Sequence, residues 1–466
     1  MLCKPAQDWF RVVVGTTEAE WLAAPTCPNH GLKLLVPDSV TDPLGPRVGV
    51  VCRTGHVVDA GSFSTWSVGQ LEATAQAAVE ASGKVVRRRD LPIVVLVRKN
   101  DSVDPGLVDT HALIAAAEPD TMFQVASNFN CLEGSSVLTD IRSGSFVTNL
   151  MVDRTQAPAA SSACALSALV RTHGAFVHWD PHLQAHVFVG QRQLGPRGLR
   201  AQPQVELLGH PSLAPYFPVI NGKVLAVEPC GEWSEDARPP VSKFGAGAGA
   251  GAGAGTGAGT GIETETEPGL RLEQGTGAEE IVKPVGAFKV SKLLPSSIML
   301  SSRPETRALY KNVRVGLHCD APAMFRRVLE RGACEVHLEG IPVVDQVFVA
   351  AVNMNAEGAK ALRGGIAQDR MNFLLDAAYR GTYGAAALRH SKHLVLTLVG
   401  GGVFGNPWSA IGEAIGRAHA EWVCCGNCPN LETITLPVFP AGVAAVKAMV
   451  DAIRLQGVRV VVQTLT

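Results

Sequence analysis

The stretch LTLVGGGVFGNPWSAIGEAIGRA, residues 396–418, joins an apolar strand pattern to a helical pattern through a glycine-rich loop. Each glycine costs conformational entropy on folding, so three in a row at such a junction need a reason. Backbone amides without neighbouring Cβ atoms, placed before a helix N-terminus, suit an oxyanion such as a phosphate. The alternative is that the glycines form only a tight turn beneath a closely packed helix.

The surrounding pattern predicts an α/β fold. Strand and helix patterns alternate through residues 393–399, 408–422, 431–439, 444–456 and 458–465. Such alternation predicts a mixed sheet with helices on both faces, in three layers. Ligands of these sheets bind where strands end at their carboxyl edge, and the glycine loop is predicted to lie there.

The N-terminal half has the same mixture of short apolar runs and helical stretches. Strands are expected at 10–14, 47–52, 91–97 and 121–127, and helices at 68–82 and 162–173. Four histidines between residues 173 and 186 suggest either a metal site or a histidine-bearing hairpin, and we favour the hairpin.

The chain contains one long low-complexity tract. Residues 244–269 are largely alternating glycine and alanine, and this composition predicts a flexible insertion or linker. We therefore expect an N-terminal α/β portion at 1–230, a disordered segment at 231–284, and a C-terminal α/β portion at 285–466 that carries the glycine loop. The two portions either form separate domains or complete one fold around the insertion.

Composition excludes some partners. The 41 Lys and Arg residues balance 42 Asp and Glu, so no global charge attracts nucleic acid. No signal-peptide pattern and no long apolar run is evident, so we expect an intracellular, cytoplasmic protein that does not span a membrane. The 11 scattered cysteines do not suggest a disulfide framework.

The glycine loop is neither a P-loop nor a dinucleotide fingerprint, because Lys-Ser/Thr and the G-x-G-x-x-G spacing are missing. The order strand, G-G-V-F-G-N-P, helix resembles the second phosphate-binding loop of macro domains, a family that binds ADP-ribose on a mixed α/β sheet. The segment QVASNFNCLE (124–133) is similar to the asparagine-bearing strand end of that family. The insertion would then interrupt a macro-like fold.

This resemblance implies roles for individual residues. Phe404 would pack on the distal ribose, Asn406 would lie at the loop exit, and Asn128 or Asn130 would contact the terminal ribose. Gln156 would line the cleft, or its neighbours would merely start the next helix. Backbone amides for the diphosphate would come from Gly400, Gly401, Gly402, Val403 and Gly405.

Three classes of function remain open at this point. The resemblance implies that the partner is ADP-ribose or an ADP-ribosylated protein, which would be either bound by a module or hydrolysed at the ADP-ribosyl linkage. The third class is a scaffold in which the glycine loop is only a packing turn. Cys131 or Cys164, completed by His318, His337 and Asp320, would instead suit a thiol hydrolase. The C-x-x-C of CCGNC (424–428) lacks an obvious second half, so we expect no metal and no cofactor.

Overall fold

The computed structural model describes most of the chain outside the low-complexity region. The described residues are 2–3, 9–23, 31–35, 42–82, 87–98, 110–134, 141, 143–149, 163–182, 184–191, 205–217, 219–220, 222–224, 299–329, 333–337, 340–355, 365–438 and 443–465. Met1–Glu228 and Leu294–Thr466 belong to one compact unit. The expected insertion at 231–284 and both predicted domain boundaries lie outside the described residues, so the domain division stays a prediction.

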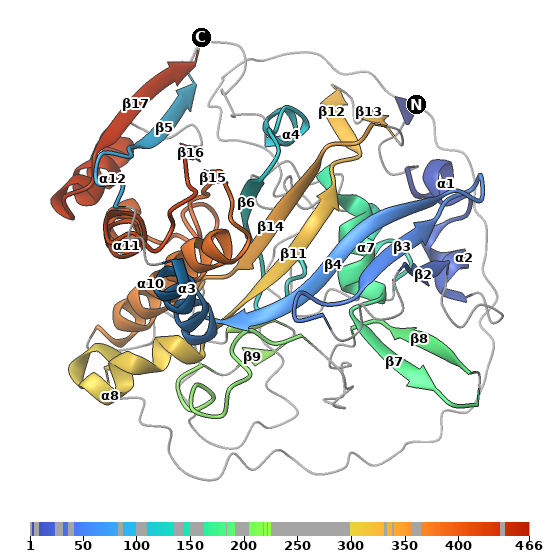
Figure 1. The fold of residues 1–466 in the computed structure, drawn as a ribbon, viewed down its shortest axis with the longest axis horizontal. Coiled ribbons are helices and arrows are strands. Elements are labelled where there is room, and N and C mark those ends of the chain that lie inside the picture. The colour runs from blue at the N-terminus through green and yellow to red at the C-terminus, as the bar shows by residue number, and fades with distance from the viewer. Residues whose placement is uncertain are drawn as a thin grey trace, which may run out of the picture. The chain divides into compact units, whose positions relative to one another are not determined.

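A ten-stranded mixed sheet organises the compact unit (Figure 1). In spatial order the strands are β17 (Val460–Leu465), β5 (Ile93–Arg98), β16 (Thr433–Pro437), β15 (His393–Val395), β6 (Thr121–Ala126), β14 (Val343–Val349), β11 (Arg314–Pro322), β4 (Val57–Ser67), β3 (Arg47–Val51) and β2 (Leu32–Leu34). The six strands from β17 to β14 in this spatial order run parallel to one another, and the remaining neighbouring pairs are antiparallel. The predicted α/β mixed sheet is confirmed.

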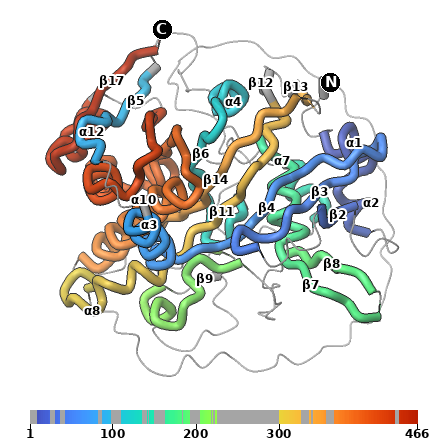
Figure 2. The backbone as a smooth tube through the Cα atoms, in the orientation of Figure 1, coloured from blue at the N-terminus to red at the C-terminus, as the bar shows by residue number. Residues whose placement is uncertain are grey.

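Strands from the two halves of the sequence are intermixed within this sheet. Strand β5 pairs with β16 on one side and β17 on the other, so an early segment lies between two late ones. Figure 2 shows β5 in blue beside β17 in red. The sheet is therefore completed only when both halves of the chain contribute to it.

Alternate side chains of a strand point to opposite faces of a sheet, and β14 follows this rule. Val347 and Val349 join a hydrophobic cluster with the helices on one face. Val344 and Phe348 join a different cluster that includes Ile114. The first cluster takes residues of α3 (Val68–Ser82), α10 (Ile366–Leu388), α11 (Trp408–His419) and α12 (Val443–Leu455), and the second is reached by α4 (Thr110–Ala115) and by Cys164 before α7 (Ala165–His173). Helices thus cover both faces, as predicted.

The expected strand at residues 10–14 is wrong. This segment lies in helix α1 (Trp9–Val13), followed by α2 (Glu18–Ala23). Trp9, Phe10 and Val13 are buried in a third hydrophobic cluster, which also takes residues of β3 and α7. Their spacing places them on one side of a helical turn, and so short an apolar run carries no period that distinguishes the two structures.

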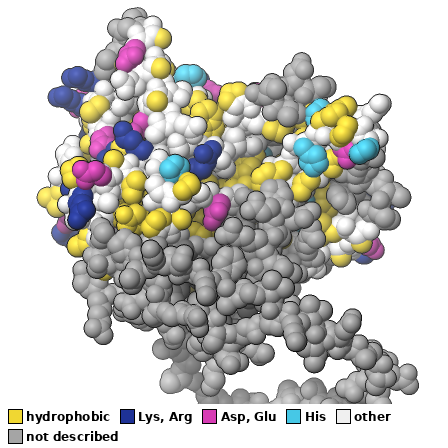
Figure 3. All heavy atoms as spheres, turned by 90° about the horizontal axis from the view of Figure 1, so that it is seen from below, with side chains coloured by type: hydrophobic (Ala, Val, Ile, Leu, Met, Phe, Trp, Pro, Cys, Tyr) yellow, Lys and Arg dark blue, Asp and Glu magenta, His cyan; other side chains and the backbone are white. Residues whose placement is uncertain are grey.

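The histidine-bearing hairpin is confirmed. Strands β7 (Phe176–Asp180) and β8 (Ala185–Val189) pair antiparallel, with Trp179 opposite His186. Trp179 is 54% exposed and contacts the His186 ring, so this hairpin presents aromatic side chains to solvent. In Figure 3 several histidine side chains gather on the surface at the side of the view where the hairpin lies.

Shorter elements complete the described fold. They are β1 (Leu2–Cys3), α5 (Phe146–Asn149), β9 (Val219–Ile220), β10 (Lys223–Val224), α8 (Pro304–Arg307), β12 (Phe325–Leu329) and β13 (Ala333–Val336), with single turns of 3-10 helix at Leu300–Ser302 and Ala308–Asn312 and a π turn at Ala420–Cys424. No helix in the described part of the chain combines the length and hydrophobicity needed to cross a membrane.

A buried carboxylate ties the N-terminal helices to α5 and α7. Glu18 is 1% exposed and accepts hydrogen bonds from the amides of Val147 (3.0 Å) and Thr148 (2.9 Å) at the start of α5. It also lies 3.2 Å from His173 Nε2 at the end of α7. Burial disfavours the ionised carboxyl, but the hydrogen bonds from His173 and the two amides outweigh burial and lower its pKa below 4.5.

We expect Glu18→Ala to lower the free energy of unfolding at pH 7 by about 2–3 kcal/mol, because it strands buried donors. Because the folded pKa lies below 4.5, the contribution is present above that pH and is lost as the pH falls through the folded value. Urea unfolding of the wild type, Glu18→Ala and Glu18→Gln at pH 7 and at pH 3 measures this. A difference between wild type and Glu18→Ala that does not shrink at pH 3 contradicts it.

Candidate functional site

The candidate site lies at the carboxyl edge of three adjacent parallel strands. In register, Val349 of β14 pairs with Ala126 of β6, and Val395 of β15 pairs with Phe123 of β6. The segments that follow these strands therefore leave the sheet at the same edge. They carry Asn128 after β6 and the glycine loop (400–407) after β15, so the two predicted halves of the site share one edge.

The glycine loop is closed by its own hydrogen bonds. Asn406 N donates to Gly400 O (2.9 Å), and Gly405 N donates to Gly402 O (3.0 Å). The Asn406 side chain, 2% exposed, donates through Nδ2 to Val352 O at 2.8 Å, beyond β14. Asn406 thus closes the loop and fixes it to the neighbouring segment, in addition to lying at its exit.

Three successive backbone amides of this loop are available for binding a ligand. Among the described residues, the N–H groups of Gly402, Val403 and Phe404 have no hydrogen-bond acceptor. Gly402 is exposed and Val403 is 79% exposed, so the amides lie at the surface of the loop. Consecutive unpaired amides form a concavity that favours anions.

The helix that follows the loop adds to this preference. Helix α11 begins at Trp408, and no side chain caps its N-terminus. Pro407 occupies the N-cap position, immediately before the first turn of the helix. The N-terminus of a helix carries partial positive charge, so the loop and the helix favour the same ligand charge.

The glycines of the loop serve different purposes. Gly400 has φ +73°, and a Cβ there would lie 2.5 Å from Asn406 Nδ2 and 2.9 Å from Ala351 Cβ. Gly405 has φ +65°, and its Cβ would lie 2.5 Å from Asn355 Nδ2. A Cβ at Gly402 would meet nothing within 4 Å, at an ordinary φ. The backbone requires glycine at positions 400 and 405, whereas Gly402 faces open space.

The two candidate asparagines differ in their surroundings. Asn128 donates through Nδ2 to Gly134 O (2.9 Å) and accepts through Oδ1 from Lys223 Nζ (3.1 Å). Asn130 is 1% exposed, and its Oδ1 accepts from the Leu132 amide (3.2 Å). Asn128 therefore faces the Lys223 ammonium, which lies near Phe404 of the glycine loop, whereas the Asn130 side chain folds back into its own turn.

Lys223 is a site residue that our sequence analysis missed. It begins strand β10, and its Nζ lies 5.9 Å from the centre of the Phe404 ring as well as bonding to Asn128. Lys223 thereby connects the two predicted halves. The signal was available in VINGKV (219–224), because Asn-Gly between apolar residues predicts a two-residue hairpin that returns the chain at Lys223.

The remaining predicted positions have mixed outcomes. Gln156 lies outside the described residues. Gly401 N donates to Leu398 O at 2.9 Å, so this amide is occupied within the loop. Phe404 is half-buried, and its carbonyl accepts from the Met354 amide at 2.8 Å. The assignment of these residues to a ligand stays a prediction.

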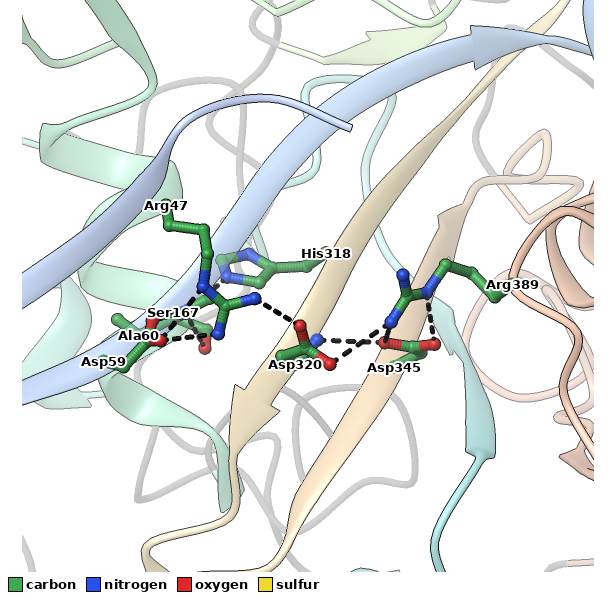
Figure 4. A network of polar contacts seen from close by, with 9 residues as sticks. Arg47, Asp59, Ala60, Ser167, His318, Asp320, Asp345 and Arg389 are labelled. Atoms are coloured by element: carbon green, nitrogen blue, oxygen red, sulfur yellow. Dashed lines mark hydrogen bonds and ion pairs between the residues drawn. The ribbon is translucent and has the colours of Figure 1, made fainter. Parts of the chain in front are cut away.

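The thiol-hydrolase alternative does not fit its surroundings. Cys131 and Cys164 are fully buried, and burial raises the pKa of both thiols, that of Cys164 to about 12. Burial also lowers the pKa of His318 to about 3, and its Nε2 lies 2.7 Å from Ala60 O (Figure 4). A nucleophilic thiol needs the opposite shift, toward a thiolate.

The opposite edge of the sheet carries an ion-pair network (Figure 4). Arg389 Nε lies 2.8 Å from Asp345 Oδ2, and Arg389 Nη2 lies 3.2 Å from Asp320 Oδ1. Arg47 bonds to Asp320 and Asp59. A cavity of about 370 Å³ adjoins this edge, lined by Arg88, Asp120, Arg389, His390, Lys392, Pro429, Asn430 and Glu432.

This cavity is a weaker candidate than the glycine loop. Lys392 pairs with Asp120 at 2.7 Å, and Arg389 is engaged by its two aspartates. These cations are already neutralised, whereas the glycine loop offers unpaired amides. No group of three or more potential metal ligands occurs in the described ranges.

Comparisons with known proteins identify no family. No family model and no curated protein matches the sequence. Among solved structures, poly(ADP-ribose) glycohydrolase from Deinococcus radiodurans in complex with ADP-ribose is 21% identical, with a TM-score of 0.23 over 31% of this chain and 52% of that chain. The enzyme from Thermomonospora curvata is 17% identical, with a TM-score of 0.23 over 31% of this chain and 47% of that chain.

This chain thus covers about half of the length of those structures. A similarity with a TM-score of 0.23 supports no inference about fold or ligand.

We expect Gly400→Ala to destabilise the protein by about 1–3 kcal/mol, because a side chain at φ +73° strains the backbone and displaces Asn406. Gly402→Ala, the matched control in the same loop, is expected to stay within about 0.5 kcal/mol of the wild type. Chemical denaturation of the three proteins measures both values. Equal stabilities for the two variants would be incompatible with this geometry.

Proposed function

We propose that this protein binds ADP-ribose, or a related nucleotide diphosphate, at the carboxyl edge of its sheet. The observation that carries the proposal is the run of unpaired amides at Gly402, Val403 and Phe404, in a loop that Asn406 holds closed without a ligand. The amides would hold the diphosphate, and the uncapped N-terminus of α11 would stabilise its charge.

The neighbouring side chains support a ribose beside the phosphates. Phe404 offers an aromatic face against which a sugar can pack, and Asn128 offers an amide for sugar hydroxyls. Both adjoin Lys223, so they border one place at the edge of the sheet. The macro-domain resemblance of the glycine loop implies the same arrangement, and the macro-like assignment is part of this proposal.

Binding without hydrolysis is the form of the function that we favour. A hydrolase of this kind needs a group that activates or positions water. Among the described residues, no carboxylate is hydrogen-bonded or ion-paired to Asn128 or Lys223. The target would be free ADP-ribose or an ADP-ribosylated protein.

Calorimetric titration of ADP-ribose into the wild type and into Gly402→Glu tests the site. We expect micromolar binding by the wild type and at least about 100-fold weaker binding by the variant, because a carboxylate beside the phosphates adds like-charge repulsion. The open space around Gly402 predicts that the variant folds normally, and Gly402→Ala controls for the added side chain. No heat with folded wild type would leave the loop as a packing turn and favour the scaffold.

Incubation with an ADP-ribosylated peptide separates a module from a hydrolase. We expect the peptide to bind and to keep its modification, since no carboxylate among the described residues contacts Asn128 or Lys223 to activate a water molecule. Mass spectrometry of the peptide over several hours measures release. Release that disappears in Gly402→Glu would show that the protein is an enzyme instead.

A further inference from the structure

The position of Lys223 is fixed by the structure around it. Strand β10 pairs with β9, and Gly222 O accepts from the Phe129 amide at 2.7 Å, within the turn that follows β6. Gly222 has φ +76°, and a Cβ there would lie 2.3 Å from Asn130 Oδ1. The hairpin therefore packs closely on the turn at residues 128–131, the asparagine turn, and this contact fixes the backbone position of Lys223.

Lys223 has no counter-charge among the described residues. Its Nζ donates to the neutral Asn128 Oδ1 at 3.1 Å and lies over the Phe404 ring, and no carboxylate pairs with it. Burial, with no opposing charge, lowers the pKa of Lys223 from 10.5 to about 8. Lys223 is half-buried, and holding an ammonium group partly out of water without an anion is unfavourable, so the position costs stability in the free protein.

We propose that Lys223 is the counter-charge for an anionic group of the ligand and makes the site specific for phosphate-bearing molecules. This inference rests on the proposed function and deepens it. The ligand's anionic oxygens would lie between the Lys223 ammonium and the amides of Val403 and Phe404, on the side of the site bordered by Asn128. The ammonium supplies charge that the amides alone lack, and charged hydrogen bonds are the stronger ones.

The proposal has a pH dependence that a purely structural lysine would lack. Lys223 contacts Asn128 and Phe404, and neither of these side chains titrates. No titratable group of the described chain shifts the pKa of Lys223. Below about pH 8 the lysine is charged and binds the anion fully; above it, affinity falls as the free protein loses the proton. In the free protein, stability rises between pH 8 and 10.5, because there the unfolded state binds more protons.

Three variants test the proposal with ADP-ribose from pH 6.5 to 9.5. Lys223→Met removes the charge and keeps the length, Lys223→Arg keeps the charge at all these values, and Lys447→Met removes an exposed lysine that pairs with Asp451 on α12. At pH 7 we expect about 10- to 100-fold weaker binding for Lys223→Met, and no change for Lys447→Met. Wild-type affinity should fall above pH 8, with flat profiles for both Lys223 variants.

The melting temperature of each free protein is measured alongside. Lys223→Met should melt above the wild type at pH 7, because it removes a half-buried charge that has no carboxylate partner among the described residues, and the difference in melting temperature should narrow toward pH 10. A destabilised Lys223→Met would show that the lysine has a structural partner and would overturn the proposal. So would wild-type affinity for ADP-ribose in Lys223→Met.

Inorganic pyrophosphate separates this proposal from the proposed function. If the wild type binds pyrophosphate but not ADP-ribose, and Lys223→Met loses it, the anion role of Lys223 stands and the nucleotide assignment fails. If the wild type binds neither probe, both fail. If ADP-ribose binding depends on Gly402 but not on Lys223, the proposed function stands alone.

Discussion

The candidate site depends on one buried amide. Asn406 Nδ2 lies within hydrogen-bonding distance of three carbonyl oxygens, those of Val352 (2.8 Å), Gly400 (3.2 Å) and Phe404 (3.3 Å). These contacts close the glycine loop and fix it to the segment beyond β14. Because the loop is held from within, its free amides are already arranged before any ligand arrives, and preorganisation of this kind lowers the entropy lost on binding.

The asparagine turn, which carries the other half of the site, is anchored to β14 by a different interaction. Arg171 is fully buried, its guanidinium lies 3.9 Å above the ring of Phe348 in β14, and its Nε donates to Cys131 O at 3.4 Å. Glu133 Oε1 lies 4.0 Å from its Nη2. The asparagine turn is therefore held to β14 from one face of the sheet, while Asn406 holds the glycine loop to the end of that strand.

Much of the fold could be predicted from local pattern, and the relations across the site could not. The helix at Val68–Ser82 and the alternation after residue 393 follow from periodicity, which is a property of neighbouring residues. The expected strand at 10–14 failed because a run of five residues, four of them apolar, fits a helical turn equally well. The closing role of Asn406 depends on β14 lying nearby, and the importance of Lys223 depends on Asn128 and Phe404 meeting it, so no local pattern contained either one.

The placement of β5 has a consequence for how the chain is made. Residues 93–98 pair only with β16 and β17, which are synthesised more than three hundred residues later. During translation this apolar strand has neither neighbour, and unpaired strands of that kind are prone to aggregate. Pairings so distant along the chain also slow folding. The nascent chain therefore depends on shielding of β5 until its last strands emerge, and a separately expressed half would lack the partners that make its strands soluble.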